Sequence, residues 1–390
     1  MLISLKNAHQ QPDKVGNKAY HTSIMLNLQL PAVDGFVIAE PYSEEDIQSL
    51  WKEMKTNIPF AVRSSMGEED SETVSGAGKY ATVLSVKTYE ELKEAIETVF
   101  SSNNGTTQKA VMIQPMIDSV VSGVMFTSSP FHPNRASIEA AYGLGELVVS
   151  GQITPESYEI DKQTLTVTKE LNRHKYYGLF LQNNPLSLGE EKQTRFGNVR
   201  NVAHMNGNFL GSIPYKMRAT FCINDLQVLY LYTLGLAIEK HFGCPQDIEW
   251  AMDDKRIYLL QTRPITHKIP SSLPSFEPSS HRDDVLNGKI ASLGATEGKV
   301  KIINDSIPLE FMDDEEEFIL VAYETKPEYV HYMSRAKAIV TEIGGTLCHA
   351  AIVSRELGIP CLVGVEGITS SVSQGDHIVV NANEGEVILC

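Results

Sequence analysis

A segment rich in proline and serine constrains the fold of this chain more than any other feature. It reads HKIPSSLPSFEPSSHRDD over residues 267–284 and has no hydrophobic periodicity. Such composition is typical of a linker rather than a packed element. At 390 residues the chain is long enough for two or three domains. We therefore expect a domain over 1–266, a linker over 267–289 that spans about 25–30 Å root-mean-square, and a smaller domain over 290–390.

The composition limits the class of protein. Hydrophobic residues make up 42% of the chain and charged residues 21%, as in globular proteins. A net charge of −16 argues against a nucleic-acid surface but leaves room for a nucleotide, which needs only a few local cations. Neither a secretory signal nor a long apolar run is seen, so we expect no membrane partner. Five scattered cysteines without a CxxC pair predict reduced thiols and a cytoplasmic protein.

The pattern of apolar residues predicts a mixed α/β (α+β) chain. Residues 111–117 and 122–130 resemble neighbouring strands, and residues 158–171 and 247–261 resemble hairpins. A helix is expected over 224–243, because Gly243 and the following proline are typical stop signals. In the last domain we expect strands at 317–323, 337–342, 376–382 and 385–389 and a helix at 349–357.

Two local patterns in PFAVRSSMGEED and SGAGKY suit phosphate binding. Arg63 follows a short apolar strand, and its planar guanidinium offers several donors to phosphate oxygens. The alternative is a surface salt bridge to Glu68 or Glu69. Gly76 and Gly78 would let backbone N–H groups approach a phosphate, although most GxG sequences are simply turns.

The hairpin at 247–266 places polar side chains on one face. If its loop is 253–257, Glu249 lies opposite Gln261, and Arg263 shares their face. Carboxylate and amide oxygens at one point suit Mg²⁺, which takes few protein ligands together with phosphate oxygens. A polar, solvent-facing ribbon is an equally good interpretation. The other face is expected to hold Trp250, Met252, Tyr258 and Leu260.

His349 begins the helical segment HAAIVSREL. At the first turn of a helix, backbone donors and the helix dipole stabilise an anion, such as a phosphoryl group carried by the ring. The same field favours a neutral imidazole with a nucleophilic lone pair. Gly344 and Gly345 keep the approach to the ring open, and Gly358 ends the helix. A histidine bonded to its own turn is the competing interpretation.

Taken together, these stretches resemble the phosphoenolpyruvate-utilising enzymes, which include phosphoenolpyruvate synthase, pyruvate phosphate dikinase and rifampin phosphotransferase. GGTLCHAAIVSRELGIPCLVG resembles their phosphohistidine signature. The segments that resemble their ATP-grasp nucleotide domain, in the same order, are VGNKAYHTS, AVRSS, SGVMFTSSP, IEAAYGLGELVVSGQITPE and DIEWAMDDKRIYLLQTRPIT.

The resemblance implies a role for each candidate residue. Lys18, Arg63 and Arg263 would hold the phosphates of ATP, and Glu249 with Gln261 would hold Mg²⁺. Gln114 and Met116 would line the adenine pocket. His349 would accept a phosphoryl group from ATP, with release of AMP and phosphate, and the domain that carries it would swivel on the linker.

Three departures limit what the resemblance implies. The large domain that binds the acceptor in those enzymes is not expected here, so the acceptor is left as an unidentified small molecule. The first lobe of the nucleotide domain is expected to be trimmed, since only about 17 residues precede AVRSS after GFVIAEPY. Leu347 stands where the dikinases have a regulatory threonine. A phosphocarrier whose acceptor domain is a separate protein is the alternative, while a degenerate regulator is disfavoured because the site residues are all present.

Overall fold

The computed structural model describes residues 1–54, 57–67, 81–102, 109–182, 189–194, 197–205, 207–265, 284–304, 317–324, 326 and 329–390. They form two compact units. Unit 1 comprises Met1–Gly145 and Glu156–Thr266, and unit 2 comprises Glu146–Pro155 and His267–Cys390. Segment 146–155 thus interrupts unit 1 in sequence but belongs to unit 2 in space.

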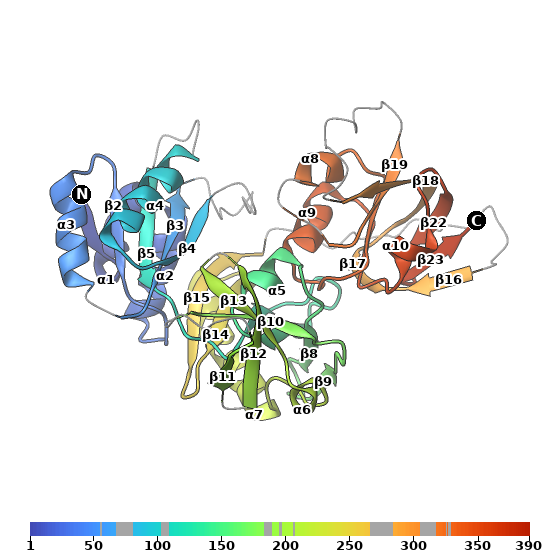
Figure 1. Cartoon of the computed structure of the whole chain (residues 1–390), viewed down its shortest axis with the longest axis horizontal. Helices are drawn as coiled ribbons and strands as arrows, with labels where there is room; N and C mark the ends of the chain where they lie inside the picture. The colour runs from blue at the N-terminus through green and yellow to red at the C-terminus, as the bar shows by residue number, and fades with distance from the viewer. Residues whose placement is uncertain are drawn as a thin grey trace. The chain divides into compact units, whose positions relative to one another are not determined.

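The N-terminal part of unit 1 is an antiparallel five-stranded sheet with helices on both faces (Figure 1). Strand residues alternate between two cores: Val111 and Ile113 pack with the helices α3 and α4, and Ala110 and Met112 pack with α1 and α2. Helices α3 and α4 begin at capping boxes, Ser43 with Asp46 and Thr88 with Glu91. In sheet order the strands are β1 (Leu2–Ser4), β2 (Phe36–Ala39), β5 (Lys109–Pro115), β3 (Phe60–Met66) and β4 (Thr82–Val86), and the helices are α1 (Leu5–Ala8), α2 (Pro12–Asn27), α3 (Glu44–Glu53) and α4 (Tyr89–Ser101).

The rest of unit 1 holds a six-stranded and a four-stranded antiparallel sheet. Their shared core contains Trp250, Tyr158, Phe180 and Phe209. The six-stranded sheet has the order β15 (Ile257–Pro264), β14 (Gln246–Met252), β6 (Val121–Phe126), β7 (Arg135–Tyr142), β8 (Glu156–Asp161) and β9 (Val167–Glu170). The four-stranded sheet has the order β10 (Tyr177–Phe180), β13 (Asn208–Ser212), β12 (Gly197–Met205) and β11 (Glu191–Thr194), with α6 (Tyr215–Arg218) and α7 (Asp225–Phe242) following it in the chain.

Most expected elements of unit 1 are confirmed, with one correction. The 158–171 hairpin is β8–β9, and the 224–243 helix is α7, which starts at a capping box on Asn224 and ends at left-handed Gly243. The two strands at 111–117 and 122–130 are not neighbours, however. β5 belongs to the five-stranded sheet and β6 to the six-stranded one. The chain crosses between the sheets at 116–120, where Val120 N bonds to Met252 O instead of continuing the β5 ladder.

Unit 2 is built on an eight-stranded mixed sheet, parallel from β18 to β21 and antiparallel elsewhere. The strands and helix expected for the last domain are confirmed as β19, β20, β22, β23 and α9. In sheet order the strands are β16 (Asp284–Asn287), β23 (Glu386–Leu389), β22 (His377–Asn381), β18 (Ala295–Ile303), β19 (Phe318–Ala322), β20 (Ala338–Thr341), β21 (Cys361–Val363) and β17 (Lys289–Ser292), and the helices are α5 (Glu146–Ser150), α8 (Val330–Met333), α9 (His349–Leu357) and α10 (Ile368–Ser371).

The expected linker ends earlier than 289. Residues 284–287 form β16, which pairs with β23, and Lys289 begins β17. The apolar pair Val285 and Leu286 explains the difference, because both side chains are half-buried at the sheet edge rather than exposed. Residues 267–283 lie outside the described part of the chain.

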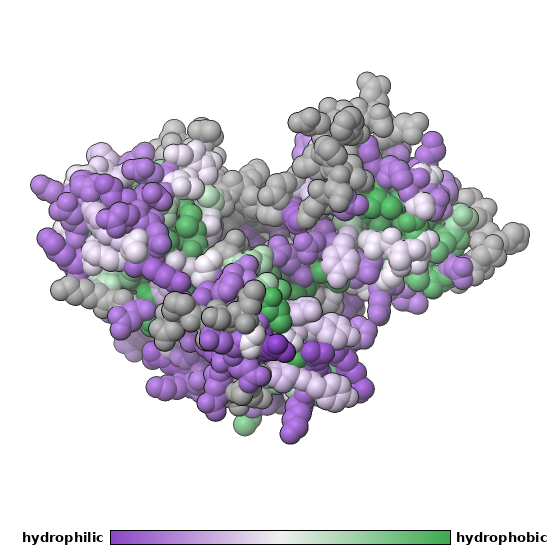
Figure 2. Space-filling model, viewed as in Figure 1, coloured by the Kyte–Doolittle hydropathy of each residue, from purple (hydrophilic) through white to green (hydrophobic). Residues whose placement is uncertain are grey.

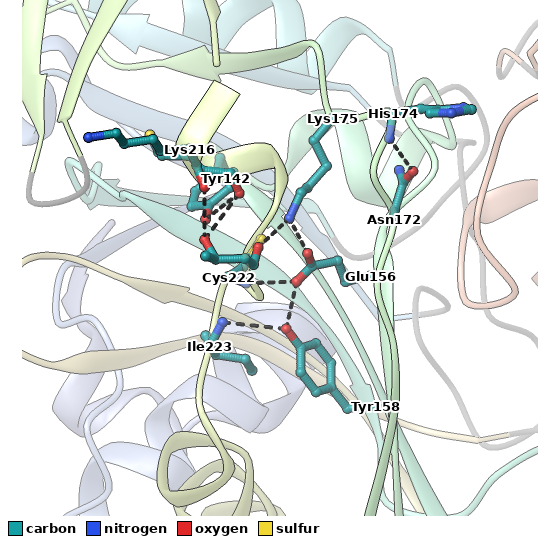
Figure 3. Close-up of polar contacts among 11 residues, drawn as sticks. Tyr142, Glu156, Tyr158, Asn172, His174, Lys175, Lys216, Cys222 and Ile223 are labelled. Carbon is teal, nitrogen blue, oxygen red and sulfur yellow. Dashed lines mark hydrogen bonds and ion pairs between the residues drawn. The ribbon is translucent and has the colours of Figure 1, made fainter. Parts of the chain in front are cut away.

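A buried ionic network joins β8 to the segments before β10 and α7 (Figure 3). The Glu156 carboxylate is fully buried and accepts hydrogen bonds from Lys175 Nζ, Tyr158 OH and Cys222 N, the last two at 2.7 Å. Lys175 also donates to the Thr220 carbonyl at 2.6 Å. Burial raises the pKa of the Tyr158 hydroxyl and of the Cys222 thiol, and the nearby Glu156 carboxylate raises both further.

The visible surface is mostly hydrophilic, with smaller hydrophobic patches (Figure 2). Among the described residues, no helix combines the length and the apolar character needed to cross a membrane.

Candidate functional site

Three of the candidate residues of unit 1 converge on one point. Arg63 on β3 reaches from the five-stranded sheet to the β14–β15 hairpin of the six-stranded sheet. Its Nη1 lies 3.4 Å from Glu249 Oε2 and 3.5 Å from Gln261 Oε1. All three side chains keep a small exposed fraction, so the cluster is accessible at its edge. Glu68 and Glu69, the alternative partners expected for Arg63, lie outside the described residues.

The hairpin has the expected pairing at its polar end. Glu249 lies opposite Gln261, and the turn occupies the residues between Met252 and Ile257. The expectation for the apolar face is wrong in part: Ile257 and Leu259, not Tyr258 and Leu260, pack with Trp250 in the core. A β-bulge between Glu249 and Trp250 adds a residue on β15, which shifts the alternation toward the turn.

Arg263 is held by a residue that the sequence reasoning missed. Its Nε donates to Asp247 Oδ2 at 2.8 Å, and both side chains are largely buried. Asp247 lies directly opposite Arg263, two residues from Glu249 along the same strand. The register that predicted the pairing of Glu249 with Gln261 therefore also predicts that Asp247 lies opposite Arg263.

Lys18 lies on α2. This helix is hydrogen-bonded to β3, the strand of Arg63, and to β15, the strand of Gln261 and Arg263. Ser65 Oγ donates to Val15 O at 2.6 Å and accepts from Ala19 N at 3.0 Å, which ties α2 to β3 two residues beyond Arg63. On the other side, the His21 Nδ1 lies 3.0 Å from the carbonyl oxygen of Thr262, between Gln261 and Arg263.

Gly16 makes the contact with β3 possible. It has φ +70° and breaks α2 just before Lys18, and a Cβ at this position would lie 2.2 Å from the Ser65 carbonyl oxygen. Lys18 is thus placed on a helix clamped between Arg63 and Arg263. The helix thus brings the backbone of Lys18 close to the strands that carry Arg63 and Arg263. Gly76 and Gly78 lie outside the described residues.

Gln114 and Met116 stand where β5 leaves its sheet. Gln114 is buried, and its Nε2 donates to the Val33 carbonyl at 2.6 Å. The amide therefore fixes the backbone at Val33 relative to β5. Met116 is buried as well, and its sulfur accepts a hydrogen bond from Ser85 N at 3.1 Å. Ser85 in turn donates to Asn208 on β13 at 2.7 Å, which joins the five-stranded and four-stranded sheets beside Met116.

His349 lies in unit 2 as the first residue of α9 and is 7% exposed. Cys348 before it has extended backbone angles, and Gly358 in the left-handed region ends the helix as expected. The loop before His349 is fixed by Arg355, whose Nη1 donates to the carbonyls of Thr346 at 2.8 Å and Ala291 at 2.7 Å. His349 therefore stands at the N-terminal end of the helix dipole on a loop held by its own helix.

The donor set of unit 1 fits a magnesium ion. Within the described part of the chain, no cluster of three or more His, Cys, Asp and Glu side chains is arranged to bind a metal. Glu249 and Gln261 instead offer one carboxylate and one amide oxygen that meet at the same arginine nitrogen. Hard oxygen donors in small number, completed by phosphate oxygens, are what Mg²⁺ takes at nucleotide sites.

Known protein families match sequence ranges in both units. Residues 41–276 match the family model described as pyruvate phosphate dikinase, AMP/ATP-binding domain, and residues 314–385 match the PEP-utilising enzyme, mobile domain. The first range contains every unit 1 candidate except Lys18, and the second contains His349.

Curated relatives match along most of the chain. A probable phosphoenolpyruvate synthase of Methanothermobacter thermautotrophicus is 33% identical over 376 residues, which cover 90% of this chain and 51% of the relative. The phosphoenolpyruvate synthases of Pyrococcus furiosus and Neisseria meningitidis are 34% and 31% identical, over 88% and 90% of this chain and 43% and 47% of theirs. The chain spans about half the length of the curated relatives it matches.

Proposed function

The chain belongs to the family of phosphoenolpyruvate-utilising enzymes, and from that premise we propose that it is an ATP-dependent phosphotransferase of the dikinase type. The β-phosphoryl group of ATP passes to a ring nitrogen of His349 and from there to a small-molecule acceptor. ATP, water and the acceptor are consumed, and AMP, phosphate and the phosphorylated acceptor are formed.

The convergence of Arg63 with Glu249 and Gln261 carries the proposal. A guanidinium and two oxygen donors at one point match the needs of a magnesium nucleotide, in which the metal and a fixed cation share the phosphate charge. Bound Mg²⁺ would neutralise phosphate charge, with Glu249 and Gln261 as its protein ligands. Phosphoryl transfer depends mainly on positioning and charge neutralisation, and both are supplied by residues fixed on strands.

The other candidates complete the nucleotide site in this proposal. Arg263, oriented by Asp247, and Lys18, carried by the clamped helix α2, bind phosphate oxygens. Met116, with Gln114 holding the backbone behind it, lines the adenine pocket. Gly76 and Gly78 bring backbone N–H groups to the phosphates.

His349 is the covalent relay. Its place at the start of α9 favours a neutral ring before transfer and stabilises the phosphoryl group after it. We propose that the domain that carries His349, whose sheet begins with β16 at residue 284, swivels on the linker that begins at 267 to reach the nucleotide domain. The cytoplasm is the compartment proposed, because all five cysteines are free thiols.

A second candidate function is a phosphocarrier in a split system, in which a separate protein supplies the acceptor domain. In this alternative the chain supplies the nucleotide site and the phosphohistidine, and the partner protein supplies the acceptor site. Purified chain that is charged by ATP but transfers to no small molecule until a partner protein is added would support it.

One experiment tests the mechanism shared by both candidates. Purified protein is incubated with Mg²⁺ and ATP labelled at the β-phosphorus, and acid-labile protein label and AMP are measured. We expect both products with wild type and neither with His349→Ala, whereas His331→Ala, a histidine on α8 of the same unit, labels normally. Label that persists in His349→Ala, or ADP as the sole nucleotide product, would rule the mechanism out.

A further inference from the structure

The two arginines of the candidate site are held in different ways. Arg263 Nε donates to Asp247 Oδ2 at 2.8 Å, the ordinary length of a charge-assisted hydrogen bond. Arg63 Nη1 lies 3.4 Å from Glu249 Oε2 and 3.5 Å from Gln261 Oε1, beyond the usual range of about 2.7–3.2 Å. The Glu249 side chain is also 24% exposed, against 7% for Asp247. Arg263 is therefore tightly held, and Arg63 is loosely held.

Arg63 lies between the two oxygens that would bind magnesium in the proposed site. Among the described residues, it is the only side chain that donates to the Glu249 carboxylate. Mg²⁺ binds its oxygen ligands at about 2.1 Å. A guanidinium nitrogen that contacts both Glu249 and Gln261 takes the space that the ion needs, and its positive charge repels the ion. Arg63 in this position and a bound Mg²⁺ therefore exclude each other.

The charges of the site explain what would move Arg63. The four charged side chains balance in two pairs, Arg63 with Glu249 and Arg263 with Asp247. A free Mg²⁺ therefore meets no excess of negative charge in these pairs. ATP supplies that excess through its phosphates, and a guanidinium binds phosphate oxygens through a planar fork of donors. The phosphates thus offer Arg63 a better partner than its long contact with Glu249.

We propose that Arg63 is a displaceable counter-ion for Glu249 and that this exchange makes metal binding depend on the nucleotide. Without nucleotide, Arg63 holds the place of the metal between Glu249 and Gln261. When ATP binds, Arg63 turns to the phosphate oxygens and releases the carboxylate and the amide oxygen, which are then free to bind Mg²⁺. The inference rests on the proposed function, to which it adds the order in which nucleotide and metal engage the protein.

The proposal gives the two arginines separate tasks. Arg263 keeps its partner throughout, because its 2.8 Å bond to Asp247 is short and largely buried. Arg63 changes partner, because its contacts are long and lie at an accessible edge. Removing the charge of Arg63 should therefore convert a metal site that needs the nucleotide into one that binds the metal alone.

Titration of the full chain with Mn²⁺ in the absence of nucleotide tests this exchange, with the free ion measured by electron paramagnetic resonance. Arg63→Met is expected to gain one site per chain that is at least about tenfold tighter than any in wild type. Arg63→Lys loses the fork but keeps the charge, and it should resemble wild type. Adding Glu249→Gln to Arg63→Met should remove the gained site. Arg135→Met, which frees Glu159 from an exposed pair, is the matched control and should gain none.

Equal Mn²⁺ affinity in wild type and Arg63→Met would overturn the proposal, whether both bind tightly or neither does. Arg63→Gln, which is also neutral but keeps a polar side chain, carries the same test if Arg63→Met does not fold. Titration with Mn²⁺ and ATP together separates this result from the proposed function. Wild type that fails to bind Mn·ATP would contradict the proposed function, whereas tight binding of Mn²⁺ alone by wild type would contradict only the exchange.

Discussion

Asp247 and Arg263 face each other across the β14–β15 hairpin, with Arg263 Nε donating a 2.8 Å hydrogen bond to Asp247 Oδ2. The pair lies two residues along each strand from Glu249 and Gln261, and Gln261 and Glu249 both meet Arg63. The antiparallel register of β14 and β15 therefore places the side-chain oxygens of Glu249 and Gln261, together with Arg263, beside Arg63. Arg63 comes from the five-stranded sheet. In the proposed nucleotide site, Asp247 would therefore orient Arg263 rather than bind the nucleotide itself.

Asp247→Asn is expected to weaken binding of Mg·ATP by about tenfold or more. The substitution removes the charge that fixes the largely buried Arg263 guanidinium, so the arginine loses its orientation toward the nucleotide. Calorimetric titration with Mg·ATP measures the effect. Asp254→Asn, on the exposed turn of the same hairpin, should bind as wild type, and unchanged affinity in Asp247→Asn would contradict the role assigned to Asp247.

Glu249→Gln is expected to raise the Mg²⁺ concentration needed for half-maximal phosphohistidine formation by about tenfold or more, since a neutral amide replaces the only carboxylate of the proposed donor pair. Binding of Mn²⁺ together with ATP, followed by electron paramagnetic resonance, gives a second readout that does not need turnover. Glu94→Gln on the exposed side of α4 controls for the loss of a negative charge. Equal metal dependence in both variants would place the ion elsewhere.

Gly16→Ala is expected to cost more stability than Gly243→Ala, although both glycines have φ near +70°. At Gly243 no atom lies within 4 Å of the added Cβ, so only the left-handed backbone is penalised, by about 1 kcal/mol. At Gly16 the Cβ would meet the Ser65 carbonyl oxygen at 2.2 Å and would push α2 off β3. Urea unfolding measures both, and weakened ATP binding only in Gly16→Ala would show that the clamp positions Lys18. Equal losses in the two variants would show that α2 tolerates the shift.

The sequence predicted the parts of the site that depend on local pattern. The pairing of Glu249 with Gln261 follows from strand alternation and a short turn, and the helix at His349 follows from its glycine stop. The β-bulge could not be predicted from the sequence, because Leu259 and Leu260 are both apolar and either could pack in the core. The separation of β5 from β6 was hidden because a strand pattern does not say which sheet a strand joins.

Long-range contacts were beyond a reading of the sequence for another reason. The bonds that clamp α2 link residues 46 and 241 positions apart, Ala19 to Ser65 and His21 to Thr262. Such pairs produce no periodic pattern in the sequence, because each joins one side chain to one backbone group that is distant along the chain. Asp247 differs, since the same register that placed Gln261 would have placed it opposite Arg263.

Breaking the Glu156–Lys175 pair from one side is expected to destabilise unit 1 by about 3–5 kcal/mol, because the remaining charge stays buried without its partner. Lys175→Met and Glu156→Gln test each side by urea unfolding. The double substitution is expected to cost less than the sum of the two, since neither charge is then left alone. The exposed pair of Arg135 and Glu159, changed to Met and Gln, serves as the control and should alter stability by under about 1 kcal/mol. Additive losses at Glu156 and Lys175 would mean that the pair is not coupled.

The same network predicts a loss of stability at alkaline pH. Burial raises the pKa of the Cys222 thiol above its ordinary 9.0 and those of the Tyr142 and Tyr158 hydroxyls above their ordinary 10.0. A group whose pKa is raised by folding contributes its full stabilisation below the unfolded pKa, and that contribution is lost as pH rises toward the folded pKa.

The free energy of unfolding should therefore be flat below about pH 9 and then fall by up to about 1.4 kcal/mol per pH unit for each group. Urea unfolding at a series of pH values measures the slope. Tyr158→Phe, which keeps the ring but removes the titrating hydroxyl, should give a shallower fall above pH 10 than Tyr215→Phe, whose ring is 82% exposed. Identical slopes in the two variants would show that the Tyr158 hydroxyl titrates alike in the folded and unfolded chain, and that the network around Glu156 is open to water.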